Sequence, residues 1–454
     1  MRGTPSPRIV IVGAGPAGIR AAATLVDAGL HPVVIDEGYR AGGDRSARPP
    51  AGFVRTPEQL YGSEAAKANA LHELFDRLAE AGRLTHRALS SVIAVHEGRL
   101  HVLGEGGVQV IGYDRLILAT GASDRVAPIP GWQSAGVYSL GAAQIALKAQ
   151  GVALGRRIVL IGSGPLLTLV GAQLVKAGAN VAAVLDTSPW HRQMRGFSGL
   201  AARPVAALRG LVLRARLGRR YHAGVALDSI AADETGATAL RWRDARGRER
   251  LTACDMIGMG WHLRAETHLA DLAGCAFIYD EQWQQWLPKT DAMGRAGNGI
   301  YLAGDGVRLL GADGAEIAGR LAATACLSDL GRPVPSVSAD LRRLARLERF
   351  AHGLARAFPW PSAMVRALSG DAIVCRCENV SAGAVRESAD FGGDANRVKS
   401  LSRVGMGRCQ GRYCQLAAVE LVAAQAGCMP DAVGRFRGQA PVRPAPVGAF
   451  LKEG

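Results

Sequence analysis

Four cysteines near the carboxyl end of the chain have the spacing of ligands for a metal cluster. Cys375 and Cys377 form a C-x-C pair, and Cys409 and Cys414 form a C-x4-C pair after 31 intervening residues. Thiolates bind soft or borderline metals, and two such loops can enclose a single ion or a binuclear cluster. Structural zinc usually has about two to four residues between paired ligands, which C-x-C does not provide. The spacing therefore favours a [2Fe–2S] cluster, with zinc, a redox disulfide and coincidental cysteines as alternatives.

Positive charge around these cysteines supports the cluster. Four thiolates, two sulfides and two ferric ions sum to about −2, and reduction adds a further negative charge. Five basic residues lie within or beside the ligand loops: Arg376, Lys399, Arg403, Arg408 and Arg412. They would stabilise the reduced form, and the alternative is a solvated basic surface. The other cysteines are scattered, and we expect them to be buried or inert: Cys254, Cys275, Cys326 and Cys428.

A glycine-rich turn near the start of the chain has the spacing of a dinucleotide-binding site. Gly13, Gly15 and Gly18 follow a short apolar segment as G-x-G-x-x-G. The first glycine permits a tight turn, the second lets the backbone approach a pyrophosphate, and the third lets the helix pack on the strand. Asp36, followed by Glu37, comes 23 residues after Gly13, where an acid can bond a ribose hydroxyl. The elements expected here are a strand at residues 9–12, a helix ending near residue 28 and a strand at residues 32–35.

Two later segments return to this first unit. Residues 116–119 and 300–303 are each predicted to form a buried strand, and a helix is expected from about residue 314. The residues that end the two strands are Thr120, Gly121, Gly304 and Asp305. An acid beside a glycine at a strand end suits the hydroxyl-bearing chain of a ligand. On spacing alone, Asp305 is equally well a binding residue or a turn residue.

A second turn of the same kind follows residue 157. Gly162 and Gly164 match the first two glycines, and Asp186 lies 24 residues after Gly162. The third glycine position holds Leu167, whose side chain would push the helix off the strand or force a wider loop. We therefore expect a second βαβ unit, in which NAD-type binding and a nucleotide fold kept only for its shape both stay open. Because no arginine stands beside Asp186, any ribose bound there would be unphosphorylated.

The composition is that of a globular enzyme with several domains. The 454 residues are 48% hydrophobic and 20% charged, which excludes a disordered chain. Aromatic residues make up only 5% and no nucleic-acid-binding motif is present, so a nucleic-acid partner is not expected. The net charge of +15 rests on 48 arginines and six lysines, and residues 341–454 carry +8 of it. No targeting segment or membrane span is visible, and eight cysteines without a signal peptide argue for a reducing compartment, so we expect a cytoplasmic protein.

The sequence contains no motif for substrate chemistry. No redox pair of the C-x4-C or C-x2-C type follows the first unit, and neither G-x-S-x-G nor H-E-x-x-H occurs. No catalytic residue is therefore predicted in this chain.

Six segments together resemble a known family. They are VGAGPAGIRAA, PGWQSAGVYSLGAAQ, GSGPLLTLVGAQL, YLAGDG, CRCENVSAG and SRVGMGRCQGRYC. They are similar to flavoprotein subunits of bacterial heteromeric amine dehydrogenases: the A subunit of opine oxidases, the α subunit of hydroxyproline and dye-linked proline dehydrogenases, and the B subunit of hydrogen cyanide synthase. The last two segments resemble the [2Fe–2S] module of bacterioferritin-associated ferredoxin.

The resemblance implies an α/β fold like that of glutathione reductase, with two Rossmann-like dinucleotide-binding domains and a small, mostly helical C-terminal [2Fe–2S] domain. It implies FAD at the first unit, through Gly13, Gly15, Gly18, Asp36, Gly43, Thr120, Gly121 and Asp305. In that family the substrate is usually oxidised on a separate β subunit, a flavoprotein like D-amino-acid oxidase, and a small ferredoxin-like γ subunit often completes the complex. Some relatives hold FMN between the two larger subunits, and some bind NAD or ATP in this type of subunit.

The domain boundaries follow from these assignments. Residues 1–123 and 291–331 are expected to form a discontinuous FAD-binding domain, and residues 124–290 a second, NAD(P)-type domain. The remaining segments expected are a linker helix at residues 332–368, the [2Fe–2S] domain at residues 369–430 and a proline-rich tail at residues 431–454.

The leading functional hypothesis is an electron-transfer subunit of a flavin-dependent dehydrogenase. The complex would oxidise the C–N bond of an amino-acid derivative of opine, hydroxyproline or proline type and pass electrons through flavin and cluster to a quinone or dye-type acceptor. It could lie peripherally at the inner membrane. The alternatives are one component of a hydrogen cyanide synthase, which would act on glycine, a self-sufficient NAD(P)H-dependent reductase, and a nucleotide-bound scaffold.

Overall fold

The first unit is a largely parallel sheet whose central strand leads into the first glycine-rich turn. The computed structural model describes residues 7–43, 48, 56, 58–59 and 62–451. The strand order is β20-β21-β7-β1-β2-β3, with β20 antiparallel at one edge. The strands are β1 (Ile9–Val12), β2 (Val33–Ile35), β3 (Thr85–Arg87), β7 (Arg115–Leu118), β20 (Arg295–Gly297) and β21 (Ile300–Leu302). Strands predicted at residues 9–12, 32–35, 116–119 and 300–303 are confirmed to within one residue.

Small residues bring two helices of this unit into close contact. Helix α1 (Pro16–Asp27) packs on α10 (Gly311–Asp329), and a Cβ added at Gly319 would lie 2.0 Å from the Ala17 carbonyl oxygen. The helix α10 begins three residues earlier than predicted, because the Asp305 carboxylate accepts hydrogen bonds from the backbone N–H groups of its first turn. Helix α3 (Ala65–Glu80) packs beside α1, while the meander β4 (Ser91–His96), β5 (Arg99–Gly104) and β6 (Gly107–Gly112) contributes to the core on the opposite face.

The second unit repeats this architecture with a five-stranded parallel sheet in the order β12-β11-β10-β16-β9. Its strands are β9 (Val137–Ser139), β10 (Ile158–Ser163), β11 (Val181–Asp186), β12 (Tyr221–Ala223) and β16 (Met256–Trp261). Its helices are α4 (Leu140–Ala149), α5 (Pro165–Lys176), α6 (Trp190–Met194), α7 (Phe197–Leu200) and α8 (Pro204–Leu217). An antiparallel sheet of β13 (Ala226–Asp233), β14 (Gly236–Arg243) and β15 (Glu249–Ala253) is inserted, and β8 (Ala122–Asp124) pairs with β17 (Leu263–Ala265) where the units join. The chain thus contains two Rossmann-like units, as predicted.

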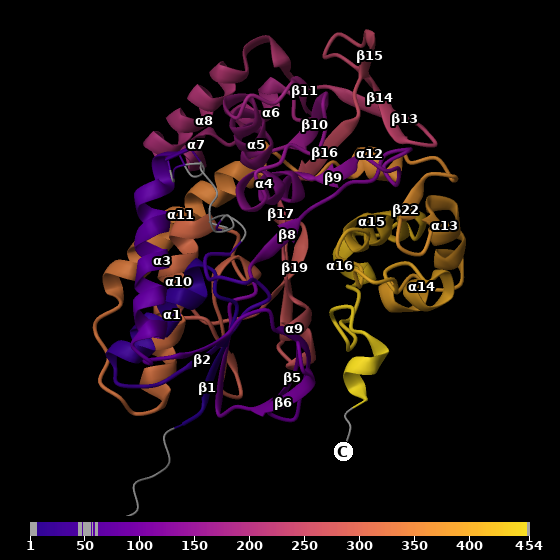
Figure 1. The fold of residues 1–454 in the computed structure, drawn as a ribbon. Coiled ribbons are helices and arrows are strands. Elements are labelled where there is room, and N and C mark those ends of the chain that lie inside the picture. Colours follow the sequence, from indigo (N-terminus) through magenta and orange to yellow (C-terminus); the bar gives the residue numbers. More distant parts are fainter. Residues whose placement is uncertain (1–6, 44–47, 49–55, 57, 60–61, 452–454) are drawn as a thin grey trace, which may run out of the picture.

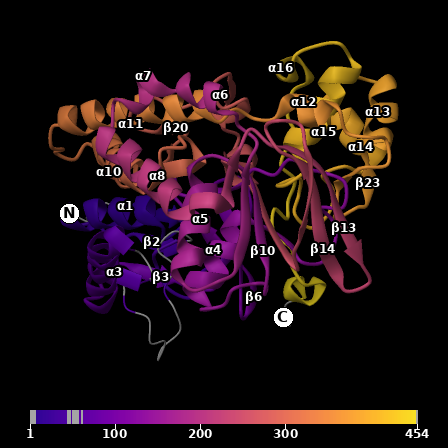
Figure 2. The same cartoon turned by 90° about the horizontal axis from the view of Figure 1, so that it is seen from above.

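A small C-terminal module packs beside the second unit (Figures 1 and 2). Helix α11 (Ser338–Ala357) leads to it across α7. Its elements are α12 (Ser362–Arg366), β22 (Ile373–Cys375), β23 (Val380–Ser381), α13 (Ala382–Asp390), α14 (Ala395–Ser402), α15 (Gln415–Gln425) and α16 (Pro430–Val433). The Trp132 indole N–H donates to the Ile373 carbonyl at 2.5 Å, and one apolar cluster runs from the second unit into the module. The module is therefore fixed to the second unit by a shared core.

The final residues return to the first unit. The Val442 N–H donates to the Ile93 carbonyl of β4 at 2.9 Å, and the Val442 side chain is buried. The next residue, Arg443, pairs with Glu37 at 2.6 Å. A short turn, η5 (Val447–Phe450), then contacts β6. The tail therefore joins the C-terminal module to the unit where the chain begins.

The close contact between α1 and α10 predicts that position 319 tolerates only glycine. Because Gly319 has no room for a Cβ, we expect Gly319→Ala to destabilise the chain by about 1–3 kcal/mol and to lower the thermal midpoint. The control is Gly210→Ala on α8, where an added Cβ meets nothing within 4 Å. Because alanine is the better helix former, this change should stabilise by about 0.5–1 kcal/mol. Equal midpoints for the two variants, measured by circular dichroism, would contradict the close crossing.

Candidate cofactor sites

The turn between β1 and α1 exposes backbone to a ligand. Gly13 has a φ of +104° and a Cβ there would lie 2.3 Å from the Ala119 carbonyl oxygen. A Cβ on Gly18 would lie 1.8 Å from the Gly13 carbonyl oxygen, so the helix packs directly on the turn. Gly15, by contrast, faces only the Cα of Gly43, at 3.9 Å from its would-be Cβ. The two glycines Gly15 and Gly43 thus leave a bare backbone surface at the amino end of α1, which fits a pyrophosphate.

The acid at the end of β2 is fixed to this turn. Asp36 accepts hydrogen bonds from the N–H groups of Ala14 (2.6 Å) and Gly38 (2.7 Å). Burial raises the pKa of Asp36, and these two hydrogen bonds lower it in part. The neighbouring Glu37 is exposed and pairs with Arg443 of the tail. The predicted ribose-binding position therefore lies directly beside the glycine turn.

A hollow of about 360 Å³ lies at the same strand ends. It is lined by Tyr39, Arg40, Ala41, Arg48, Phe75, Asp76, Ala79, Glu80 and His86. The His86 Nε2 atom is buried and has no hydrogen-bond partner among the described residues, and burial lowers the pKa of this ring. A hollow with an unpartnered nitrogen beside the strand-end acid fits the adenosine end of a dinucleotide.

The later segments meet beside the first turn. The Asp305 Oδ1 atom accepts from the N–H groups of Leu310 and Gly311, both at 2.9 Å, and Gly304 has a φ of +75°. A Cβ on Gly306 would lie 3.0 Å from the Thr120 hydroxyl oxygen. The structure therefore brings the strand end at Thr120 and Gly121 together with the Gly304–Gly306 turn.

The second turn presents a different surface. Gly162 has a φ of +139° and its would-be Cβ lies 1.8 Å from the Gly260 carbonyl oxygen, so the strand contact resembles that of the first unit. Gly164, however, has a φ of +97°, and a Cβ there would lie 3.0 Å from the His262 ring. Leu167 points into an apolar cluster and is fully buried. The ring of His262 therefore covers the position that Gly15 leaves bare in the first unit.

The carboxylate of Asp186 is buried and forms its hydrogen bonds with other groups of the protein. It is 0% exposed and accepts hydrogen bonds from the Tyr221 hydroxyl (2.5 Å) and the Ser188 N–H (2.8 Å), with Arg214 at 3.8 Å. Burial raises the pKa of Asp186 to about 6. The sequence placed no arginine beside this acid, but the structure brings Arg214 to it from α8. Asp186 and Asp36 thus occupy equivalent strand ends in different surroundings.

The four predicted cysteine ligands converge in the C-terminal module. The thiols of Cys375 and Cys414 lie within hydrogen-bonding reach of each other, as do those of Cys377 and Cys409. Cys414 also interacts electrostatically with the other three. The hydrogen bond from Cys414, assisted by backbone N–H groups of Gly405 and the 377–378 turn, lowers the pKa of Cys375 to about 6. The eight cysteines, all within the described part of the chain, form no disulfide.

The cysteines are arranged as two pairs. Within the described residues, no set of three or more His, Cys, Asp or Glu side chains surrounds one point as a single metal ion would require. A binuclear cluster needs another arrangement, in which each iron takes a pair of thiolates. The two hydrogen-bonded pairs are Cys375–Cys414 and Cys377–Cys409.

Two buried cations lie beside these thiols. Arg264 is 2% exposed and interacts electrostatically with Cys409 and Cys414, while Lys399 is 4% exposed and interacts with Cys414. Arg264 also interacts electrostatically with Glu266, and Lys399 with Asp271, but neither cation forms an ion pair with a described carboxylate; Lys399 donates to the Arg437 carbonyl at 3.1 Å. Burial lowers the pKa of both groups. Because Glu266 is already paired with Arg412 and Asp271 with Arg435, positive charge exceeds negative charge beside the thiols, and the site fits a group of net negative charge.

The other predicted cations have separate partners. Arg376 lies over the rings of Trp132 (5.2 Å) and Tyr413 (5.3 Å), and Arg403 pairs with Glu378 at 2.9 Å. Arg408 is exposed. Sequence spacing did not identify Arg264, because it comes from β17, far from the cysteines in the chain.

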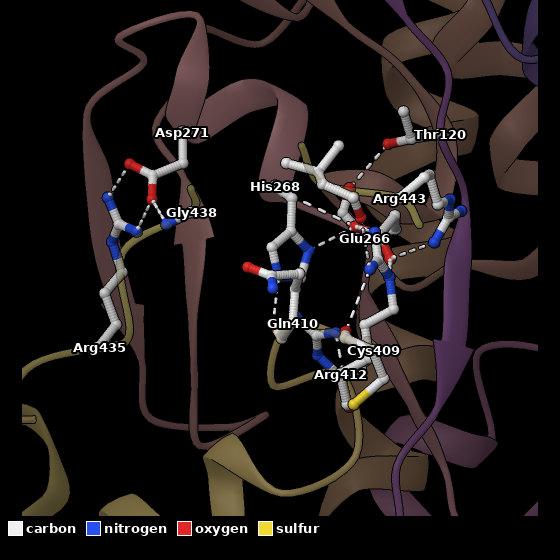
Figure 3. A network of polar contacts seen from close by, with 12 residues as sticks. Thr120, Glu266, His268, Asp271, Cys409, Gln410, Arg412, Arg435, Gly438 and Arg443 are labelled. Atoms are coloured by element: carbon white, nitrogen blue, oxygen red, sulfur yellow. Dashed lines mark hydrogen bonds and ion pairs between the residues drawn. The ribbon is translucent and has the colours of Figure 1, made fainter. Parts of the chain in front are cut away.

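A buried carboxylate connects the cysteine loop to the first unit (Figure 3). Glu266 accepts from Arg412 through Nε (2.6 Å) and Nη2 (3.1 Å), lies 2.6 Å from His268 Nδ1, and has Arg443 Nη1 at 4.0 Å. Arg412 also donates to the Cys409 carbonyl at 3.1 Å, and the Thr120 hydroxyl donates to the Glu266 carbonyl at 2.7 Å. Burial would raise the pKa of Glu266, but His268 and Arg412 hold it well below its ordinary value. The strand end at Thr120 and the ligand loop at Cys409 are therefore both anchored on one residue, which no sequence motif marks.

The bridge makes a prediction about stability. Glu266→Gln would leave Arg412 buried without its counter-charge, and we expect it to cost about 3–5 kcal/mol. Because the folded-state pKa of Glu266 is depressed, its stabilisation is present above the ordinary glutamate pKa and is lost as the pH falls through the depressed value, a loss that the variant should lack. The control, Asp228→Asn, removes a half-buried partner of the exposed Arg243 and should change stability by less than about 1 kcal/mol. Unfolding curves that shift equally for both variants would contradict a stabilising role for the contact between Glu266 and Arg412.

Comparison with known proteins agrees with this architecture. Residues 7–322 match the pyridine nucleotide-disulphide oxidoreductase family. The A subunit of opine oxidase from Rhizobium meliloti is 34% identical, with 96% of this chain and 85% of that protein aligned. Hydrogen cyanide synthase subunit HcnB of Pseudomonas aeruginosa is 31% identical over 98% and 99% of the two chains. The crystal structure of L-proline dehydrogenase from P. horikoshii superposes with a TM-score of 0.73 over 98% of this chain and 80% of that one; at 20% identity this shows the fold alone. The chain therefore belongs to the pyridine nucleotide-disulphide oxidoreductase family and is an oxidoreductase subunit related to HcnB and to the A subunit of opine oxidase.

Proposed function

We propose that this chain is the electron-transfer subunit of a heteromeric dehydrogenase that oxidises the C–N bond of an amino-acid derivative. Two relatives that align over nearly the whole chain are named as subunits, of opine oxidase and of hydrogen cyanide synthase. An opine is our first candidate substrate class, with hydroxyproline, proline and glycine as the others. The observation that carries the proposal is the convergence of four cysteines beside two buried cations, Arg264 and Lys399, that form no ion pair with a described carboxylate.

The first unit would hold FAD. The bare backbone of Gly15 and Gly43 would receive the pyrophosphate, Asp36 would bond the ribose, and the hollow at His86 would receive the adenine. Thr120, Gly121 and Asp305 would lie along the rest of the cofactor. When bound, FAD supplies a group that accepts electrons in pairs and releases them singly.

The C-terminal module would hold a [2Fe–2S] cluster on Cys375, Cys377, Cys409 and Cys414. The two thiol pairs provide two ligands for each iron, and Arg264 and Lys399 provide the positive charge that offsets a dianionic group. A cluster there would exchange single electrons. The Glu266 bridge would keep the two sites at a fixed separation.

The second unit would have the fold of a nucleotide-binding domain without binding a nucleotide. The His262 ring covers Gly164, and Asp186 already bonds Tyr221 and Ser188. This geometry disfavours NAD at Gly162, Gly164 and Asp186, and with it the hypothesis of a self-sufficient NAD(P)H reductase. Mixing anaerobic protein with NADH tests this point, since we expect no flavin bleaching.

Substrate chemistry would belong to a partner. The partners we propose are a β subunit like D-amino-acid oxidase, which removes a hydride from the substrate, and a small ferredoxin-like γ subunit, with FMN between the two larger subunits as in some relatives. A quinone or dye-type acceptor would receive the electrons. Oxidation of an opine at full rate by this chain alone would refute this division of labour.

The cluster can be tested with paired variants. Anaerobically purified chain, with whatever co-elutes, should contain iron and labile sulfide, released FAD and an electron paramagnetic resonance signal after reduction. Cys377→Ser should abolish the signal, whereas Cys428→Ser, which alters a half-buried cysteine outside the two pairs, should retain it. Iron and sulfide absent from fresh wild-type material, or an equal loss in both variants, would contradict the proposal.

The buried cations should set the reduction potential. Arg264→Met and Lys399→Met each remove positive charge that stabilises the reduced cluster, so the potential should fall by tens of millivolts, since about 59 mV corresponds to a tenfold change for one electron. Arg408→Met removes an exposed charge next to Cys409 and should have a smaller effect, because solvent screens it. Potentiometric titration would measure the shifts. An unchanged or raised potential in both buried-site variants would exclude this role.

A further inference from the structure

One segment of the second unit has an extreme charge pattern. Residues 187–227 contain eight arginines and no lysine, aspartate or glutamate. Their charge of +8 is more than half of the net +15 of the whole chain. The segment follows β11 and forms α6, α7 and α8, none of which contributes to the proposed cofactor sites.

Large apolar side chains on these helices face solvent. The exposed residues, between 44% and 67% accessible, are Trp190, Met194, Phe197, Val205, Leu208, Leu211 and Val212. On α8, Val205, Leu208 and Val212 are spaced by three and four residues and so share one stripe, while Leu217 alone among its residues is fully packed. We call this set of seven residues the α6–α8 patch.

The patch is held together internally and surrounded by cations. Arg214 of α8 donates to Gln193 of α6 at 2.6 Å and lies 4.9 Å from the centre of the Trp190 ring. Two arginines pair with other parts of the chain, Arg203 with Asp313 and Arg209 with Glu64. The exposed arginines of the segment for which the described residues provide no ion pair are Arg192, Arg195, Arg216, Arg219 and Arg220, the last of which donates to the Val181 carbonyl at 3.1 Å.

We propose that the α6–α8 patch docks the protein on a membrane surface rich in anionic lipid. The exposed Leu and Val side chains of α8, together with Trp190 of α6 and Phe197 of α7, would enter the headgroup region, and the surrounding arginines would bind lipid phosphates. The segment carries only positive charge over its 41 residues, which complements the negative surface potential of an anionic lipid bilayer. Among the described residues, no helix is long and apolar enough to cross a bilayer, so the contact would be peripheral.

The placement of the patch suits this role. Helices α6, α7 and α8 lie at the upper part of the molecule in Figure 1, while the C-terminal module lies on its right-hand side. Docking through the patch would therefore leave the side of the molecule that carries the C-terminal module facing away from the membrane. The proposal does not depend on either cofactor, so it can fail or stand independently of the proposed function.

Sedimentation of the full chain with vesicles tests the proposal. We expect binding to vesicles of phosphatidylcholine mixed with phosphatidylglycerol, weak binding to phosphatidylcholine alone, and a decrease with salt. The double variants Leu208→Gln/Val212→Gln and Arg216→Glu/Arg219→Glu should each weaken binding at least about tenfold.

Matched controls alter exposed residues elsewhere. Val110→Gln/Leu401→Gln replaces exposed apolar residues on β6 and α14, and Arg99→Glu/Arg332→Glu reverses exposed arginines of the first unit, so neither should change binding. Unchanged thermal midpoints would show that all variants fold. Absence of wild-type binding to the mixed vesicles, or equal binding by patch and control variants, would overturn the proposal. Loss of a co-purifying protein in the patch variants without any vesicle binding would assign the surface to a protein partner instead.

Discussion

The buried carboxylate of Glu266 is the constraint on which the arrangement of the two candidate sites depends. Its charge is retained in the interior because Arg412 and His268 both point at it, and its backbone bonds the strand end at Thr120 and Gly121. Removing either member of a buried ion pair lowers the free energy of unfolding, because it leaves the other charge buried without a partner. An intact pair holds its two segments in one relative position. The C-terminal module is thereby held against both dinucleotide units, through a shared core on one side and this ionic contact on the other.

The two glycine-rich turns show how one sequence pattern can lead to two surfaces. Both need glycine where the strand passes the turn, at Gly13 and Gly162. They differ at the second glycine of each turn. An added Cβ on Gly15 would approach only the Cα of Gly43, whereas one on Gly164 would meet the His262 ring. The acids that follow differ in the same way, since Asp36 lies beside the turn and Asp186 is enclosed by Tyr221 and Ser188.

Local pattern determined what could be predicted from the sequence. Strand and helix bounds around the first turn were predictable because apolar runs and glycines act within a few residues. The convergence of the four cysteines was predictable from their spacing, but the pairing of Cys375 with Cys414 and of Cys377 with Cys409 was not. The residues that complete the sites were not: His262, Arg264, Glu266 and His268 share one short segment, far in sequence from both the turns and the cysteines they contact. The start of α10 was also missed, since the cap from Asp305 depends on how the preceding turn folds.

The return of the tail to β4 and Glu37 has a consequence for biosynthesis. The first sheet combines strands from near the beginning of the chain with β20 and β21, and its far face is completed by Val442. The second sheet draws only on residues 137–261. Because the ribosome synthesises the chain from its amino end, every strand of the second unit is made before the first unit is complete. The first unit needs residues close to the carboxyl end of the chain before it can fold fully. Cofactor loading at the first turn would then be a late, post-release event.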